Sequence, residues 1–182
     1  SFLASDIAFH AMTSNASGLI DLGTLGGRNS AAYGLNDHGF VTGRSDVTGN
    51  TAQRAFLYNG SGPITDLGTL GGQNSHGADV NNSGQVVGSS QIAGNTAQHA
   101  FLFNGSGPLV DLGTLGGSNS YATAINNVGQ IVGASFVTGN SAQRGFLYSG
   151  GSMVDLGHLG SGHSLAYDIN DNGDVVGWSY NA

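Results

Sequence analysis

The side chains best suited to acid–base or ligand chemistry gather in the last quarter of the 182-residue chain. Two imidazoles can act as general acid and base or ligate a metal. Aromatic faces beside polar side chains suit sugar rings, which offer apolar CH faces and hydroxyl edges. The candidate ligand-binding residues of this segment are Trp178, Tyr180, His158 and His163. For an enzyme, the acid–base candidates are His158, His163, His10 and Tyr167.

A second group of basic side chains recurs at one sequence position. Its members, each two residues before Phe or Met, are His10, Arg54, His99 and Arg144. Such a set could hold an anion or a carboxylated sugar. The alternative is structural, in which each basic side chain pairs with an Asp of the same or a neighbouring repeat.

The segment Asp168 to Val175, "DINDNGDV", partly matches the start of a calcium loop, with oxygens at Asp168, Asn170, Asn172 and Asp174. A calcium loop of that type also needs a bidentate Glu, and Ser179 occupies its place. We therefore expect a hairpin turn here and no cofactor. Calcium at this turn, or an ion in an axial channel, stays open as the alternative.

These residues are positioned by an internal repeat. "DLGTLGG" starts at Asp21, Asp66 and Asp111, and "DLGHLGS" starts at Asp155. The missing half of the last unit aligns with the N-terminus, where "HAMTSNASGLI" matches "HAFLFNGSGPLV". The chain thus contains four repeats, with the fourth split between the two ends. Their ranges are 21–65, 66–110, 111–154, and 155–182 plus 1–20.

Residues present in only one repeat are free to serve a site, and the fourth repeat departs most. His158 stands where the other repeats have Thr, and His163 stands where they have Asn. Trp178 replaces Arg44, Ser89 and Ala134. The alternative is that the strands joining the termini need different packing.

Each unit reads as four short strands. In the second repeat we expect strands near 76–80, 85–90, 100–104 and 109–114, with Gly84 closing the first turn in a left-handed conformation. Four strands in about 45 residues is typical of a propeller blade. The predicted fold is all-β, a single domain over 1–182, and a four-bladed β-propeller closed by pairing of the two terminal halves. The alternative architecture is half of an eight-bladed ring that a second chain completes. The sequence is therefore compatible with both a monomer and a closed dimer.

The recurring polar residues are expected to stabilise turns. The Asp of each Asp-Leu-Gly (Asp21, Asp66, Asp111, Asp155) should cap the following Gly turn, although four carboxylates could also bind a cation. The Asn at 36, 81, 126 and 170 should bond to the backbone of their own turns.

The units resemble a bacterial extracellular repeat family named for its His-Ala-Phe tripeptide. That tripeptide is intact at His99-Ala100-Phe101, and the "DLGTLGG…NS…IN…GQVVG" pattern extends over essentially the whole chain. The resemblance implies a secreted or surface-associated bacterial β-protein. It implies no catalytic residues.

Composition narrows the function further. The chain has no Cys, Lys or Glu and a net charge of −7, which argues against disulfides, thiolate metal sites and nucleic-acid partners. No apolar run approaches a membrane span, and residues 1–11 lack the features of a signal peptide. Nucleophile-elbow, zinc-protease and phosphate-loop motifs are missing.

The function expected first is a non-catalytic module that binds carbohydrate or a small polar ligand, or a surface scaffold. The alternatives are a polysaccharide-cleaving lyase or hydrolase with its site on the fourth repeat, and a ligand-free symmetric scaffold.

Overall fold

Antiparallel sheets joined by turns make up the computed structural model, which describes residues 8–181 and contains no α-helix in that range. Of the predicted single domain over 1–182, residues 1–7 and 182 lie outside the described residues. Three sheets have four strands and two have only two strands. The four-stranded sheets are β3 (Gly26–Leu35), β4 (Val41–Val47), β5 (Gln53–Tyr58) and β6 (Thr65–Asp66); β7 (Gly71–Val80), β8 (Val86–Ile92), β9 (Gln98–Phe103) and β10 (Val110–Asp111); and β11 (Gly116–Ile125), β12 (Ile131–Val137), β13 (Gln143–Ser149) and β14 (Ser152–Asp155).

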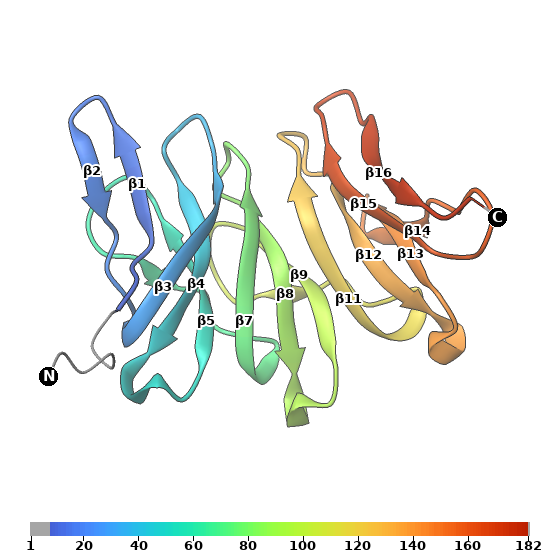
Figure 1. The fold of residues 1–182 in the computed structure, drawn as a ribbon, viewed down its shortest axis with the longest axis horizontal. Helices are drawn as coiled ribbons and strands as arrows, with labels where there is room; N and C mark the ends of the chain where they lie inside the picture. Colours follow the sequence, from blue (N-terminus) through green and yellow to red (C-terminus); the bar gives the residue numbers. More distant parts are fainter. Residues whose placement is uncertain (1–7, 182) are drawn as a thin grey trace, which may run out of the picture.

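The two-stranded sheets contain the split repeat. β1 (Met12–Asn15) and β2 (Gly18–Asp21) form the N-terminal half-sheet, and β15 (Ser164–Ile169) and β16 (Val175–Ser179) form the C-terminal half-sheet. The five sheets lie side by side in chain order, and the two half-sheets lie at opposite ends of this array (Figure 1). Among the described residues no strand pairing joins the half-sheets. The all-β prediction is confirmed, whereas ring closure is not part of this structure and stays a prediction.

The predicted four strands per repeat are present, with shifted bounds. In the second repeat, β7 begins at Gly71, five residues before the predicted start, because Gly71 pairs with Ile92 at the end of β8. β10 is only two residues long, since the chain turns away at Gly113. Gly84 has φ +74°, so the left-handed turn position was predicted correctly.

One fully buried Phe occupies the same position in each four-stranded sheet: Phe56, Phe101 and Phe146. Each belongs to an apolar cluster that also contains an Ala from the preceding repeat: Ala11, just before β1, Ala55 and Ala100. The sheets therefore bury their cores against their neighbours, as expected for repeats that are too small to fold alone.

Glycine permits the closest approach inside each sheet. A Cβ built on Gly88 would lie 1.9 Å from the carbonyl oxygen of His76, on the paired strand. Gly43 and Gly133 meet carbonyl oxygens at 2.0 and 2.1 Å in the same way. The close approach of the paired backbone thus explains why Gly recurs at the position of Gly88 in "VVGSS".

A ladder of asparagines links successive repeats. Asn81 Oδ1 accepts hydrogen bonds from the backbone N–H groups of Ser83 and Gln85, as predicted for a turn residue. Its Nδ2 donates to Gln85 Oε1 of the same turn and also to the next repeat, and the sequence did not indicate this second bond. The bonds of this ladder are Asn36 Nδ2 to Asn81 O (2.6 Å), Asn81 Nδ2 to Asn126 O (3.1 Å) and Asn126 Nδ2 to Asn170 O (2.9 Å).

Candidate functional site

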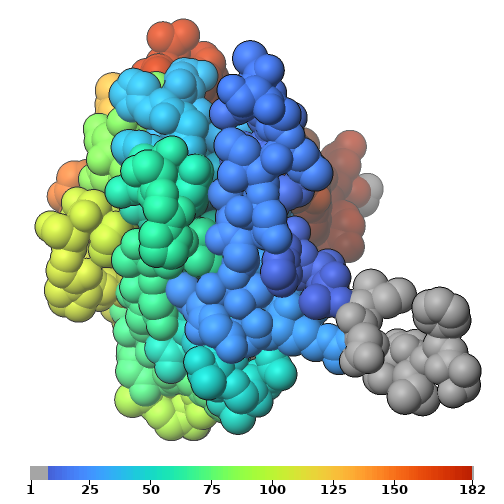
Figure 2. All heavy atoms as spheres, turned by 90° about the vertical axis from the view of Figure 1, so that its left-hand side faces the viewer, coloured from blue at the N-terminus to red at the C-terminus, as the bar shows by residue number. Residues whose placement is uncertain are grey.

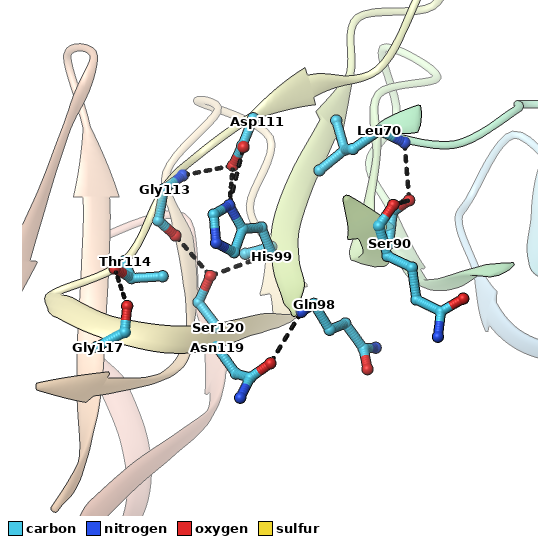
Figure 3. Close-up of polar contacts among 12 residues, drawn as sticks. Leu70, Ser90, Gln98, His99, Asp111, Gly113, Thr114, Gly117, Asn119 and Ser120 are labelled. Atoms are coloured by element: carbon cyan, nitrogen blue, oxygen red, sulfur yellow. Dashed lines mark hydrogen bonds and ion pairs between the residues drawn. The ribbon is translucent and has the colours of Figure 1, made fainter. Parts of the chain in front are cut away.

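The recurring Asp residues cap the turns that follow them. Asp111 Oδ1 accepts the backbone N–H of Gly113 at 2.8 Å, and the other three Asp-Leu-Gly motifs repeat this bond. Figure 3 shows Asp111 between the N–H of Gly113 and the ring of His99. The capping role is therefore confirmed.

Three of the four recurring basic side chains pair with these carboxylates. His99 Nδ1 lies 2.8 Å from Asp111 Oδ2, and His10 Nδ1 lies 2.9 Å from Asp21 Oδ2. The guanidinium of Arg144 lies 3.4 Å from Asp155. Since the array is open, these pairs form a row with one member per sheet. The structural interpretation of this position, pairing with an Asp, is thus confirmed at three positions.

Arg54 differs from its three counterparts, the residues at the same position of the other repeats. Its Nε is buried and makes no hydrogen bond to any of the described residues. Among these residues no ion pair joins it to Asp66, whose Oδ1 caps Gly68. Among the described residues, Arg54 is therefore the recurring basic side chain that does not pair with its Asp.

The two histidines of the fourth repeat accept backbone hydrogen bonds. His163 Nδ1 accepts from the N–H of Gln143 at 3.3 Å, where Asn119 Oδ1 accepts from Gln98 at 2.8 Å in the preceding repeat. His158 Nδ1 accepts from the N–H of Gly162 at 3.1 Å. His163 thus takes over an acceptor role that Asn performs elsewhere in the array, whereas His158 accepts from a different N–H than Thr114, which accepts from Gly116.

An aromatic cluster does form at the C-terminal end. The rings of Trp178 and Tyr180 lie 5.0 Å apart, and those of His163 and Tyr180 lie 5.8 Å apart. Tyr167 is exposed on β15 and makes no ring contact with them among the described residues. His10, just before β1, lies at the opposite end of the array (Figure 1). The acid–base candidates are therefore not brought together.

The oxygens of the calcium-like segment serve its own turn. Asn170 Oδ1 accepts the N–H groups of Asn172 and Asp174, and Asn170 Nδ2 donates to Asp174 Oδ2 at 3.0 Å. Asp168 Oδ1 accepts from the N–H of Ile169. Within residues 8–181, no three His, Asp or Glu side chains cluster as metal ligands would. The predicted hairpin turn is confirmed.

Sequence reasoning missed a polar groove between the first and second four-stranded sheets. It has a volume of about 470 Å³ and is lined mainly by charged, amide and hydroxyl side chains. The lining residues with hydrogen-bonding side chains include Arg44 and Asp46 from β4, Gln53 from β5, His76 from β7, Gln91 from β8 and Gln98 from β9. Strands of two repeats thus meet to form one concave surface.

Arg44 and His76 share an aromatic neighbour beside this groove. The Tyr33 ring lies 4.6 Å from the His76 ring, and the Arg44 guanidinium carbon lies 5.9 Å from the centre of the Tyr33 ring. Among the described residues, the Arg44 guanidinium makes no ion pair within 4.0 Å. Its N–H groups can therefore be offered to a ligand.

The ionisable groups of the groove have shifted pKa values. Burial lowers the pKa of His76, and the Arg44 charge lowers it further. Burial acts to raise the pKa of Asp46, but hydrogen bonds from Gln53 and Asn29 and the charge of Arg44 outweigh it and lower that pKa. Near neutral pH the groove therefore holds a neutral imidazole, an ionised carboxylate and a guanidinium.

Departure from the repeat, the criterion that singled out Trp178, also identifies the groove. Arg44 occupies the position of Trp178 in the first repeat. His76 has Ala31, Tyr121 and Leu165 as counterparts, and Asp46 has Gln91, Phe136 and Tyr180. The groove could not be predicted because the sequence does not show that these residues, which come from two different repeats, line the same groove.

No protein-family model matches the chain, and no curated protein matches it either. Within the described residues there is no helix with the length and apolar character needed to cross a membrane.

Proposed function

We propose that this chain is a non-catalytic binding module of propeller-type blades, and that it binds carbohydrate or a similar polyhydroxylated ligand in the polar groove. The observation that carries this proposal is the groove itself, whose lining combines a guanidinium, an imidazole and several amides. A secreted or surface location, and membership of the His-Ala-Phe repeat family, accompany this proposal on the strength of the sequence resemblance.

The groove offers the groups that sugars need. Amide side chains both donate and accept hydrogen bonds, which suits hydroxyl groups. The Arg44 fork suits a sugar carboxylate or a pair of hydroxyls. Several groove side chains are held in place by their neighbours, since Gln53 Nε2 donates to Asp46 Oδ1 at 2.9 Å and Asn74 Nδ2 donates to Gln91 Oε1 at 3.0 Å. Such fixed partners reduce the ordering cost of binding.

A four-bladed ring closed within one chain would require the two half-sheets at the ends of the array to meet, and it is the alternative to the pairing between copies that is proposed below. A polysaccharide-cleaving activity and a ligand-free scaffold remain the functional alternatives, and the measurements below separate them.

The test is binding of neutral and uronic-acid oligosaccharides, measured by glycan array and then by calorimetry. The variants Arg44→Ser and His76→Ala introduce residues already present at the counterpart positions Ser89 and Ala31, so the fold should tolerate them. We expect each to weaken binding by at least about tenfold, equivalent to 1.4 kcal/mol. Trp178→Ala is the matched control outside the groove and should bind like the parent.

Binding that is lost only with Trp178→Ala would move the site to the aromatic cluster. Binding to no member of the panel would overturn the proposal. Turnover of a bound oligosaccharide that disappears with His158→Ala would show an enzyme instead.

A further inference from the structure

The two half-sheets at the ends of the array are complementary parts of one four-stranded sheet. By repeat position, β15 and β16 correspond to β11 and β12, whereas β1 and β2 correspond to β13 and β14. In each complete sheet the second strand pairs with the third along all but its last residue. The corresponding edges, one on β16 and one on β1, have no strand partner among the described residues.

Apolar side chains that are buried inside the array are exposed at its ends. Met12 is 54% exposed, although its counterparts Phe56, Phe101 and Phe146 are 0% exposed. Val176 is 62% exposed, whereas its counterparts Thr42, Val87 and Val132 are also 0% exposed. Leu19, 72% exposed, corresponds to Ile64 and Leu109 at 6% and 8%. Among the described residues, the unpartnered edges thus expose side chains at positions that are buried core positions in the complete sheets.

The C-terminal half-sheet carries an apolar groove where a core side chain is missing. This groove, about 340 Å³ in volume, is lined by Gly145, Leu156, Ala166 and Val175, among others. Their counterparts in the first sheet are Ala11, Leu22, Ala32 and Val41, which pack around Phe56. The groove therefore has the setting in which the other sheets hold a Phe, and the residue of the split repeat that corresponds to that Phe is Met12.

The N-terminal end has a matching apolar groove of about 280 Å³. Met12 and Thr13 line one side of it, and Leu35 and Val41 line the other. Leu35 is 62% exposed, whereas its counterparts Val80, Ile125 and Ile169, each covered by a preceding sheet, are at most 7% exposed. Figure 2 looks onto this end, with the N-terminal half-sheet turned toward the viewer.

Two of the features that usually keep edge strands apart, charged side chains and Pro, are absent from β1 and β16. Natural edge strands are protected by charged side chains, Pro, bulges or a covering element. β1 (MTSN) and β16 (VVGWS) contain no charged residue and no Pro. Both edges are therefore suited to pairing with another strand.

We propose that a second copy of this chain covers these edges, so that β1 of one copy pairs antiparallel with β16 of another and completes a four-stranded sheet between them. A second copy is the partner because the half-sheets of one chain lie at opposite ends of the array, with three four-stranded sheets between them (Figure 1). The complete sheets fix the register: Val132 pairs with Leu147, so Val176 pairs with Thr13 of the other copy, and Gly177 with Met12.

This contact joins different surfaces of the two copies, so it repeats from copy to copy. Such head-to-tail contacts form a ring where the rotation closes and a filament where it does not. The contact is independent of the polar groove between the first two four-stranded sheets. Loss of assembly and loss of ligand binding are therefore separable results.

The first test is the mass of the 182-residue chain in solution over a concentration series, by sedimentation velocity. We expect species at multiples of the 18.3 kDa chain mass, with larger species at higher concentration. Val176→Asp places a charge on the β16 edge and should leave only the monomer. Val128→Asp is the matched control, because Val128 is 67% exposed in a turn away from both edges, and it should assemble like the parent. A parent that stays monomeric throughout the series overturns the proposal.

The second test uses the absence of Cys to probe the register. Partner Cα atoms of adjacent antiparallel strands lie about 4.5–5.5 Å apart, which a disulfide can span. The variant Thr13→Cys with Val176→Cys should give a reducible ladder of cross-linked chains on a non-reducing gel. Ser14→Cys with Val176→Cys shifts the register by one residue and turns the two thiols to opposite faces, so it should cross-link much less.

Two results of this gel contradict the proposal. Free thiols after mild oxidation would show that the edges do not meet. A disulfide formed within single chains would show that the half-sheets of one molecule pair with each other, which is the closed four-bladed ring.

Discussion

Whether the array is open can be tested by truncating the same repeat position in two places, once inside the array and once at its N-terminal end. Phe101 and Met12 occupy the same position of their repeats, but Phe101 is fully buried between sheets and Met12 lies on the N-terminal edge. We expect Phe101→Ala to lower the free energy of unfolding by about 3–5 kcal/mol, the range for truncating a buried Phe. Only about half of the Met12 surface is buried, so scaling the 2–5 kcal/mol of a buried Met gives about 1–2 kcal/mol for Met12→Ala.

The assay is urea denaturation for the free energy of unfolding and thermal denaturation for the melting temperature, both followed by far-ultraviolet circular dichroism. Both substitutions are made in the parent chain and measured at a concentration where sedimentation velocity shows only monomer, so that a second copy does not cover Met12 and the β16 edge stays intact. For a chain of this length, about 1 kcal/mol shifts the melting temperature by about 2–4 °C, so the two variants should differ by several degrees. Equal losses for Phe101→Ala and Met12→Ala would refute the open arrangement, because Met12 would then be as buried as its counterparts.

Three further predictions concern the groove, the sheet packing and the asparagine ladder. Burial lowers the pKa of His76. The stability that the neutral His76 contributes is therefore present above the ordinary pKa of His and is lost as the pH falls through the lowered value. Thermal melts between pH 7.5 and 5 should show a smaller loss of stability on acidification in His76→Ala than in the parent. Gly88→Ala should destabilise by about 1–3 kcal/mol or more in urea titrations, because its Cβ would meet a backbone carbonyl. Gly145→Ala, whose counterparts are Ala and whose Cβ would lie 3.2 Å from the backbone N of Ala166, should cost clearly less than Gly88→Ala, and a similar loss in both would contradict the packing argument. Asn126→Ala removes partly buried hydrogen bonds within and between repeats and should lower the free energy of unfolding by about 1–3 kcal/mol. Asn172→Ala, on an exposed turn, should change it by no more than about 0.5 kcal/mol.

The repeat made much of the local structure predictable. The Asp111 cap and the Gly84 turn each depend on a few neighbouring residues, and the sequence shows these directly. The donation from Asn81 to the next repeat was not predictable in the same way. It depends on how one sheet stacks on another, which a repeat length does not determine.

The candidate site was predicted less well for a related reason. His163 departs from the repeat, yet its Nδ1 accepts the same kind of backbone N–H that Asn119 accepts in the preceding repeat. A departure in residue type therefore did not mean a departure in role. Arg44 and His76 also depart from the repeat, but only the stacking of two sheets shows that they share a groove.

The asparagine ladder gives the array a direction. In each of the three bonds, the Asn of the earlier repeat donates and the carbonyl of the later repeat accepts. A unit inserted by gene duplication would receive a bond from its predecessor and donate one to its successor without any new interface. The number of repeats in such an array could therefore change one unit at a time, because every internal repeat makes the same contact with one predecessor and one successor.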